Sequence, residues 1–178
     1  MTQRKPPHLR SQLSDTNTCM YETTRHFIEA RQPFCENKLK FIENVERVEG
    51  GIATKCFDNA LALYKTKRGS RFVSGWVVNK HDEKHNLTAI LQHWWVQDMT
   101  GKCYDSTPNM SEDYDYVQDM DIFWYGENNF KDIKSQVTMN LMFKDGTYWL
   151  VEQVEPEFIA HPITEIKTEI LFRSENAD

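Results

Sequence analysis

Long apolar runs are missing from this 178-residue chain. No stretch of 18 consecutive apolar residues occurs, so no transmembrane helix is expected. Residues 1–7 (MTQRKPP) also lack the apolar segment that is typical of a secretory signal peptide. Internal repeats and low-complexity segments are absent as well. We therefore expect a soluble, cytoplasmic protein that has no contact with a membrane.

Basic residues and cysteines are both in short supply. The sequence has 27 acidic against 21 basic residues and a net charge of -6, so neither a predominantly phosphate-binding surface nor a nucleic-acid partner is expected. The four cysteines are widely spaced and form no C-x-x-C pair: Cys19, Cys35, Cys56 and Cys103. This spacing argues against a zinc ribbon and against a dense disulfide scaffold. In a reducing cytosol all four should remain thiols.

Apolar and aromatic residues, in contrast, are plentiful. The chain is 39% hydrophobic and has ten Phe, seven Tyr and five Trp, enough to bury one substantial core. The polar composition of residues 1–18 predicts a flexible N-terminal arm. Residues 19–178 are therefore expected to form a single domain.

Hydrophobic periodicity divides this domain into helical and extended segments. Residues 18–30 and 54–66 have the spacing of amphipathic helices, and residues 164–172 predict a closing helix. Residues 39–48 suit either a short helix or a strand, and residues 111–121 predict an acidic, tyrosine-rich loop. Apolar segments between turn signals predict strands at residues 71–79, 87–97, 102–105, 137–143 and 148–154.

One cysteine, one histidine and one aspartate occur in an order that suits a thiol nucleophile. Cys56 falls in the first turn of the second predicted helix, where the helix dipole favours a thiolate. His93 lies inside the second predicted strand, and Asp105 ends the third. A turn at Gly101 makes these two strands antiparallel neighbours, so the side chains of His93 and Asp105 should meet. We expect the Cys56 sulfur within about 4 Å of a His93 ring nitrogen.

Two segments resemble the transglutaminase-like branch of the papain-like cysteine enzymes. Residues 92–108 (QHWWVQDMTGKCYDSTP) are similar to the histidine strand, turn and aspartate strand of that family, which ends in an Asp-x-Thr signature. Residues 55–60 (KCFDNA) are similar to its cysteine helix. The resemblance extends from Thr54 to Pro108. It implies an α+β, papain-like fold in which a nucleophile helix packs on an antiparallel sheet.

The resemblance also implies a role for each residue. Cys56 would be the nucleophile, His93 the general base, and Asp105 the residue that orients the imidazole. Such a triad forms a thioester and needs neither a cofactor nor a metal. The expected activity is that of a cysteine-dependent peptidase, amidase, deamidase or transglutaminase that acts on a protein or peptide. Backbone N–H groups at the start of the helix are the natural oxyanion donors.

Four further residues are candidate binding residues: Asn59, Trp95, Gln97 and Tyr116. Alternation along the strand places Trp95 and Gln97 on the face of His93. Asn59 lies one helical turn from Cys56. Tyr116 belongs to an aromatic cluster that could floor a binding groove. The asparagine could equally bond to nearby backbone, and the aromatic cluster could equally pack against the sheet.

Other interpretations stay open. His93 could be a core histidine, and Asp105 could simply initiate a turn. A metal site made of Cys103 and the three triad residues is disfavoured, because the usual short ligand spacings are missing. The chain could also be a catalytically silent, papain-like module that binds a host protein, as a phage or bacterial accessory protein would. The oligomeric state is not predicted.

Overall fold

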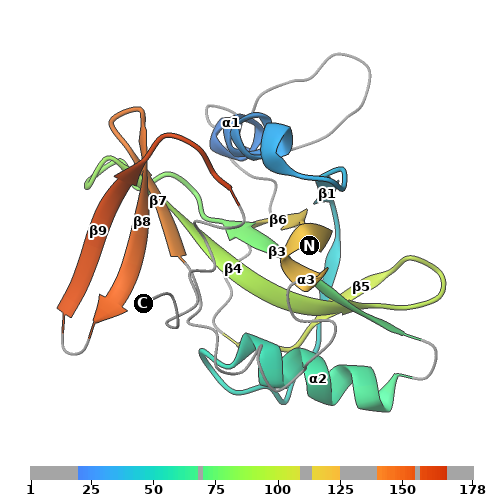
Figure 1. Ribbon diagram of the computed structural model, residues 1–178. Helices are drawn as coiled ribbons and strands as arrows, with labels where there is room; N and C mark the ends of the chain where they lie inside the picture. The colour runs from blue at the N-terminus through green and yellow to red at the C-terminus, as the bar shows by residue number, and fades with distance from the viewer. Residues whose placement is uncertain (1–19, 68–69, 109–113, 125–139, 155–156, 168–178) are drawn as a thin grey trace, which may run out of the picture.

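The computed structural model (Figure 1) describes residues 20–67, 70–108, 114–124, 140–154 and 157–167. Within these ranges the chain combines helices with one mostly antiparallel sheet, so it is an α+β protein. The predicted arm at residues 1–18 lies outside them. The elements are α1 (Glu22–Arg31), η2 (Gln32–Phe34), β1 (Lys40–Ile42), β2 (Val45–Arg47), α2 (Cys56–Thr66), β3 (Arg71–Val78), β4 (Leu87–Gln97), β5 (Cys103–Asp105), β6 (Asp115–Gln118), α3 (Met120–Trp124), β7 (Asn140–Lys144), β8 (Thr147–Val154) and β9 (Glu157–Ile163).

Within the described residues the sheet has nine strands, and its main path runs β1-β6-β3-β4-β7-β8-β9. Strand β5 pairs with β4 and with β2, and the β2–β5 pair is parallel. Residues 43–44 alone separate β1 from β2, yet these two strands pair at opposite ends of the run β6-β3-β4-β5. This run therefore curls round until its flanks approach each other. The curl gives the sheet an inner face and an outer face.

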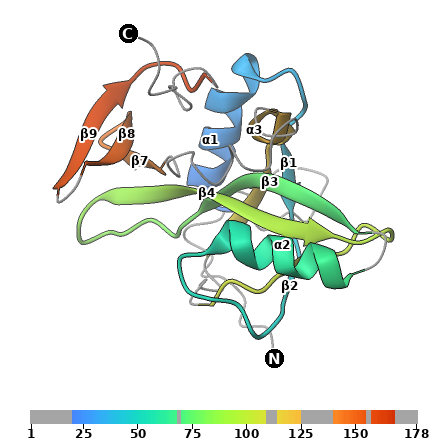
Figure 2. The same cartoon turned by 60° about the horizontal axis from the view of Figure 1, so that its bottom comes forward.

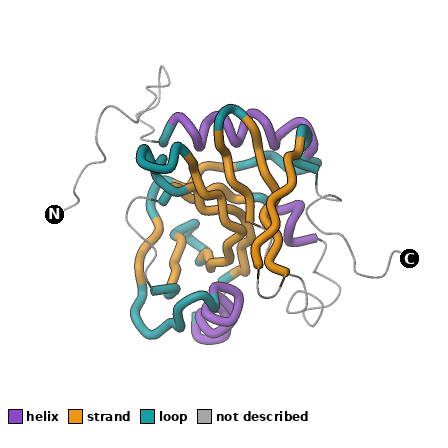
Figure 3. Tube along the Cα trace, turned by 90° about the vertical axis from the view of Figure 1, so that its left-hand side faces the viewer, coloured by secondary structure: helices purple, strands orange, loops and turns teal. Residues whose placement is uncertain are grey.

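Apolar side chains cover both faces. The main core lies on the outer face, where Phe27 of α1 and Leu63 of α2 belong to one cluster with Trp94 of β4. The two helices lie toward opposite ends of this face, α1 at the top and α2 at the bottom of Figures 1 and 3. A smaller inner core contains Val73, Val77, Trp95, Cys103 and Tyr116. The expected alternation along β4 is therefore confirmed, because Trp94 and Trp95 pack on opposite faces.

Helix α1 is fastened to the sheet at both ends. The Tyr21 N–H and the Thr24 hydroxyl each donate a 2.7 Å hydrogen bond to Asp115 Oδ2 of β6, so a carboxylate from another element caps the helix. At the other end, the fully buried Arg31 pairs with Asp119 at 2.9 Å. Breaking such a buried pair by removing one partner typically costs about 3–5 kcal/mol.

Some elements differ from those expected. Residues 39–48 form the two short strands β1 and β2, and the expected loop at 111–121 contains β6, which pairs with both β1 and β3. Residues 164–167 are not helical, since β9 runs to Ile163; the rest of the predicted closing helix lies outside the described residues. Helices of the described part lack the length and apolar character needed to cross a bilayer.

Candidate active site

The start of α2 presents Cys56, which is half-buried. Cys56 is the first helical residue, so its backbone N–H has no partner within the helix. No side chain caps this end, where Lys55 is the N-cap residue. Thr54 has a φ of 63°, a left-handed conformation that is strained for a β-branched residue. Such strain persists where surrounding contacts hold the backbone in place.

Asn59 supplies the first of these contacts. Its Oδ1 accepts the Ile52 N–H, and its Nδ2 donates to the Ile52 carbonyl, both at 2.8 Å. The same Nδ2 lies 3.2 Å from Thr107 Oγ1, just beyond the end of β5. Asn59 therefore fixes the loop before Cys56 and ties α2 to the segment that follows Asp105.

The same loop approaches the end of β5 through a glycine. A Cβ at Gly51 would lie 1.9 Å from the Ser106 carbonyl oxygen, so no side chain fits at this position. The Val48 N–H, shortly after β2, donates to the Asp105 carbonyl at 2.9 Å. These contacts hold residues 48–55, the cysteine loop, against the end of β5 and the residues that follow it.

His93 and Asp105 meet on the inner face of the sheet. The β4–β5 register pairs Gln97 with Cys103, which brings Asp105 to the face of His93. His93 Nε2 lies 2.7 Å from Asp105 Oδ2, and the two residues are 3% and 1% exposed. The prediction that they lie within hydrogen-bond reach on neighbouring antiparallel strands is confirmed.

An opening in the strand pairing leaves room for α2 beside His93. Strand β4 pairs with β7 as far as Leu91 and with β5 from Val96 onward. Within the described ranges, residues 92–95 therefore have a strand partner only on the β3 side. Helix α2 packs against β4, as Figure 2 shows, and brings Cys56 to the imidazole.

The Asp105 carboxylate has three hydrogen-bond donors besides His93. Tyr116 Oη donates to Oδ2 at 2.7 Å, the Thr107 N–H donates to Oδ1 at 2.8 Å, and Arg47 Nη1 lies 3.4 Å from Oδ2. Burial by itself raises the pKa of Asp105, but the hydrogen bond and the charge of His93 outweigh it and, with further hydrogen bonds, hold the pKa below its ordinary value. Asp105 is thus kept as an anion.

The His93 ring bridges Asp105 and Cys56. Asp105 takes Nε2, which leaves Nδ1 for the side chain of Cys56, the second hydrogen-bond partner of the ring. Burial by itself lowers the pKa of His93, but the hydrogen bonds with Asp105 and Cys56 and the charges of both partners raise it to about 9. His93 is therefore mainly cationic at neutral pH.

The four candidate binding residues are all buried: Asn59, Trp95, Gln97 and Tyr116. Gln97 accepts a 2.7 Å hydrogen bond from Arg71 Nε and donates one of 2.9 Å to the Gly101 carbonyl. The Trp95 ring packs perpendicular to that of Tyr116, with centroids 5.4 Å apart. These side chains make their contacts inside the protein, and a role for them in binding a substrate stays a prediction. They hold the strands and the triad in place.

Cys103 and the three triad residues are not among the described side chains that group as possible metal ligands. Cys103 lies in the inner core, where burial raises its pKa. Among the described residues, one group of possible ligand atoms lies within 4.8 Å of one another: Cys35, Asp119 and Asp121. Burial and the neighbouring carboxylates raise the pKa of Cys35 to about 12, and both carboxylates accept hydrogen bonds from within the protein. We assign no metal centre to this group.

Sequence reasoning missed Arg47 altogether and did not predict how Tyr116 contributes. Arg47 lies directly opposite Asp105 in the parallel β2–β5 pair, and no local pattern signals a pairing between such distant segments. The sequence places Tyr116 in a loop, whereas it lies on β6 and its hydroxyl donates to Asp105. Thr107, in contrast, occupies the threonine position of the Asp-x-Thr signature, and its N–H bond to Asp105 gives that spacing a physical meaning.

The fold and the site together define an α+β protein with a buried histidine held between a carboxylate and a thiol. No family model, curated protein or solved structure matches the chain. Its function must therefore be inferred from the geometry and electrostatics of its own side chains.

Proposed function

We propose that this protein is a cysteine-dependent amide or acyl-transfer enzyme with a papain-like, transglutaminase-like triad. One observation carries the proposal: the His93 ring joins a buried carboxylate to a thiol at the first position of a helix. Nucleophile, base and orienting group thus occur in the mutual contact that thiol catalysis requires. The backbone strain at Thr54 supports the proposal, because such strain clusters at active sites.

The chemistry follows from these contacts. The Cys56 thiolate attacks the substrate carbonyl carbon, and the negative charge moves to the carbonyl oxygen. When the tetrahedral intermediate collapses, the bond to the leaving amine breaks and His93 gives that amine its proton, which leaves a thioester on Cys56. Water or a second amine, deprotonated by His93, then attacks the thioester and frees the thiolate. Asp105 keeps the imidazole oriented and stabilises its cationic form throughout.

The helix start provides the electrostatic help. The Cys56 N–H has no partner within the helix and no capping side chain competes at that end, so it can donate to the developing oxyanion. The positive end of the helix dipole favours both the thiolate and the oxyanion.

Thiol reactivity tests the proposal without knowledge of the substrate. Iodoacetamide at about pH 6–7 should alkylate Cys56 faster than Cys35 or Cys103, because a cationic imidazole favours the thiolate at low pH, whereas burial raises the pKa of both other thiols. Intact-mass spectrometry with 4-nitrophenyl acetate should show a single acetyl adduct that is lost in Cys56→Ala and His93→Ala and kept in Cys35→Ala.

The silent binding module gives the opposite result. It predicts that Cys56 labels no faster than an exposed model thiol and that no acyl adduct accumulates. Both results together, in a protein with native circular dichroism, would end the enzymatic interpretation.

A further inference from the structure

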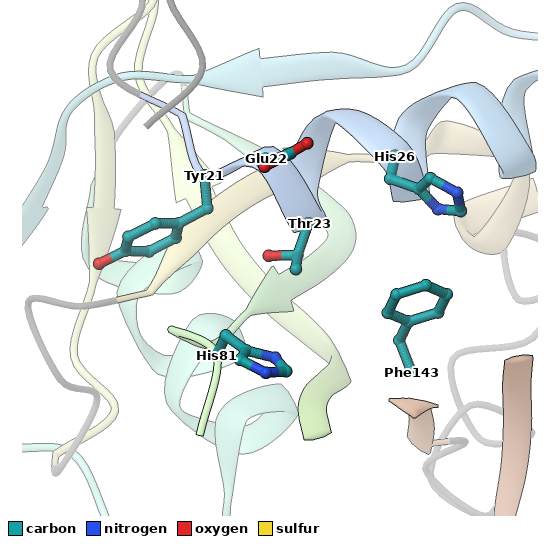
Figure 4. Close-up of a pocket in the computed structure, with 6 residues that line it drawn as sticks. All are labelled: Tyr21, Glu22, Thr23, His26, His81 and Phe143. Carbon is teal, nitrogen blue, oxygen red and sulfur yellow. The ribbon is translucent and has the colours of Figure 1, made fainter. Parts of the chain in front are cut away.

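A cavity lined by none of the triad residues lies between α1, the β3–β4 connection and β7 (Figure 4). Its volume is about 270 Å³, which suits a single small ring system. Six residues line it: Tyr21, Glu22, Thr23, His26, His81 and Phe143. We propose that this cavity binds a small, uncharged, planar heteroaromatic molecule of the nucleobase class.

A cluster of aromatic rings makes the cavity suitable for a flat ligand. The Phe143 ring is tilted against two neighbours, with its centroid 5.0 Å from that of His26 and 4.7 Å from that of Tyr148. These two contacts hold the Phe143 ring in place. A preformed aromatic face favours a planar ligand, since stacking then costs little side-chain entropy.

Two imidazoles at the cavity are already oriented by hydroxyl groups. His26 Nδ1 lies 2.7 Å from Tyr148 Oη, and His81 Nδ1 lies 3.0 Å from Oγ1 of the fully buried Thr88. Each imidazole therefore has Nδ1 engaged with a hydroxyl of the protein, which leaves Nε2 to pair with a polar group on the edge of a ligand.

Thr23 adds a hydroxyl that is not paired within the described part of the chain. Its Oγ1 is buried and has no hydrogen-bond partner among the described residues. Leaving a buried hydroxyl unpaired costs about 1–3 kcal/mol, and a ligand that pairs with it would recover this free energy. The adjacent Thr24 differs, because its hydroxyl donates to Asp115. Hydrogen-bonding side chains thus surround an apolar floor. This arrangement matches the polar edge and the flat faces of a nucleobase.

Charge selects against a phosphorylated ligand. Glu22 is an exposed carboxylate that lines the cavity. Its ion-pair partner Arg25 also pairs with Glu29, at 3.1 Å, so the charge of Arg25 is divided between two carboxylates. The whole chain has a net charge of -6. A free base or nucleoside avoids the repulsion that a nucleotide or a nucleic-acid strand would meet here.

Two-dimensional NMR titration of the full chain with adenine, cytosine, uracil, adenosine and AMP tests the proposal. At least one base or its nucleoside should bind saturably with a dissociation constant on the order of 0.1–1 mM, as expected for so small a ligand. Thr23→Val should weaken that binding about fivefold or more while the melting temperature stays equal or rises. Thr24→Val should lower the melting temperature and keep the affinity of the folded protein. Phe143→Ala should weaken binding, and His85→Ala, outside the cavity, should not.

The outcomes are decisive in either direction. Saturable binding that Thr23→Val weakens and Thr24→Val preserves establishes the site. Absence of saturation at several millimolar, or equal affinity in wild type and Thr23→Val, overturns it. Tighter binding of AMP than of adenosine overturns the assignment to uncharged ligands. None of these measurements depends on the activity of Cys56.

Discussion

The Tyr116 hydroxyl and the Asp105 carboxylate share a 2.7 Å hydrogen bond, and it falls on Oδ2, the same oxygen that bonds His93. One buried carboxylate oxygen therefore receives two short bonds, one from β4 and one from β6. This arrangement fixes the carboxylate in space and lowers its affinity for a proton.

Removing the Tyr116 hydroxyl should loosen this arrangement. Tyr116→Phe keeps the ring packing but deprives Asp105 of one donor, which should lower the free energy of unfolding by about 1–2 kcal/mol. It should also slow alkylation of Cys56 near pH 6 severalfold, because the imidazole loses part of its support. Urea unfolding and timed labelling measure the two effects. Tyr114→Phe, at the margin of the inner core, is the matched control and should change neither.

Stability should depend on pH in a direction set by His93. The pKa of His93 rises from 6.5 to about 9 on folding, so its contribution is complete below pH 6.5 and is lost as the pH increases through about 9. The loss should approach about 3 kcal/mol as an upper bound. Asp105 acts oppositely, since its lowered pKa stabilises the fold above 3.8 and the effect disappears on acidification.

Urea unfolding at a series of pH values from about 6 to 10 measures this slope. Cys56→Ala should flatten it, because the thiol is one of the two groups that raise the pKa of His93. An unchanged slope in both Cys56→Ala and His93→Gln would contradict the assignment.

Gly51 should tolerate no side chain. Gly51→Ala places a Cβ 1.9 Å from the Ser106 carbonyl oxygen, which forces the cysteine loop away from β5 at a cost of about 2 kcal/mol or more. Gly50→Ala is the matched comparison, since a Cβ there meets no neighbour and only its φ of 103° is strained. Thermal unfolding should therefore show a larger loss for Gly51→Ala. Equal losses would mean that the approach to Ser106 is not what requires glycine.

Asn59 should affect the reactivity of Cys56 although it is no part of the triad. Asn59→Ala leaves the Ile52 N–H without its partner and removes one of the two donors to the Ile52 carbonyl, so we expect a loss of about 1–3 kcal/mol and slower Cys56 alkylation. Asn37→Ala is the control: it removes a comparable bond to Asp121, away from the triad, and should leave the labelling rate unchanged. Labelling monitored by mass spectrometry distinguishes the two.

The sequence alone predicts those parts of the fold and of the site that local patterns of residues determine. The turn at Gly101 predicts the antiparallel β4–β5 pair, and alternation then predicts the contact between His93 and Asp105. The helix that begins at Cys56 follows from the apolar spacing after it. In each case the interacting groups lie close in the chain or share one periodic element.

The rest of the site depends on long-range contacts that no local pattern encodes. The sequence predicts a loop where β6 forms, because the segment is acidic and all four residues of β6 are buried, so no alternation marks it as a strand. Arg47 reaches Asp105 only through the curl of the sheet. Asn59 holds the loop before Cys56 only because the fold brings both Ile52 and Thr107 within reach of its side chain. Polar side chains that serve the fold therefore resembled ligand-binding residues in the sequence.

The parallel pairing of β2 with β5 has a consequence for how the protein acquires its site. It joins Arg47 to Asp105 across 58 positions of chain, and contacts of such long range form late in folding because loop closure is slow. Until β2 pairs with β5, the loop before Cys56 lacks its contacts at the end of β5, and Cys56 should react as an ordinary thiol. Short pulses of alkylating reagent at successive refolding times would therefore show, from the reactivity of Cys56, when the sheet closes.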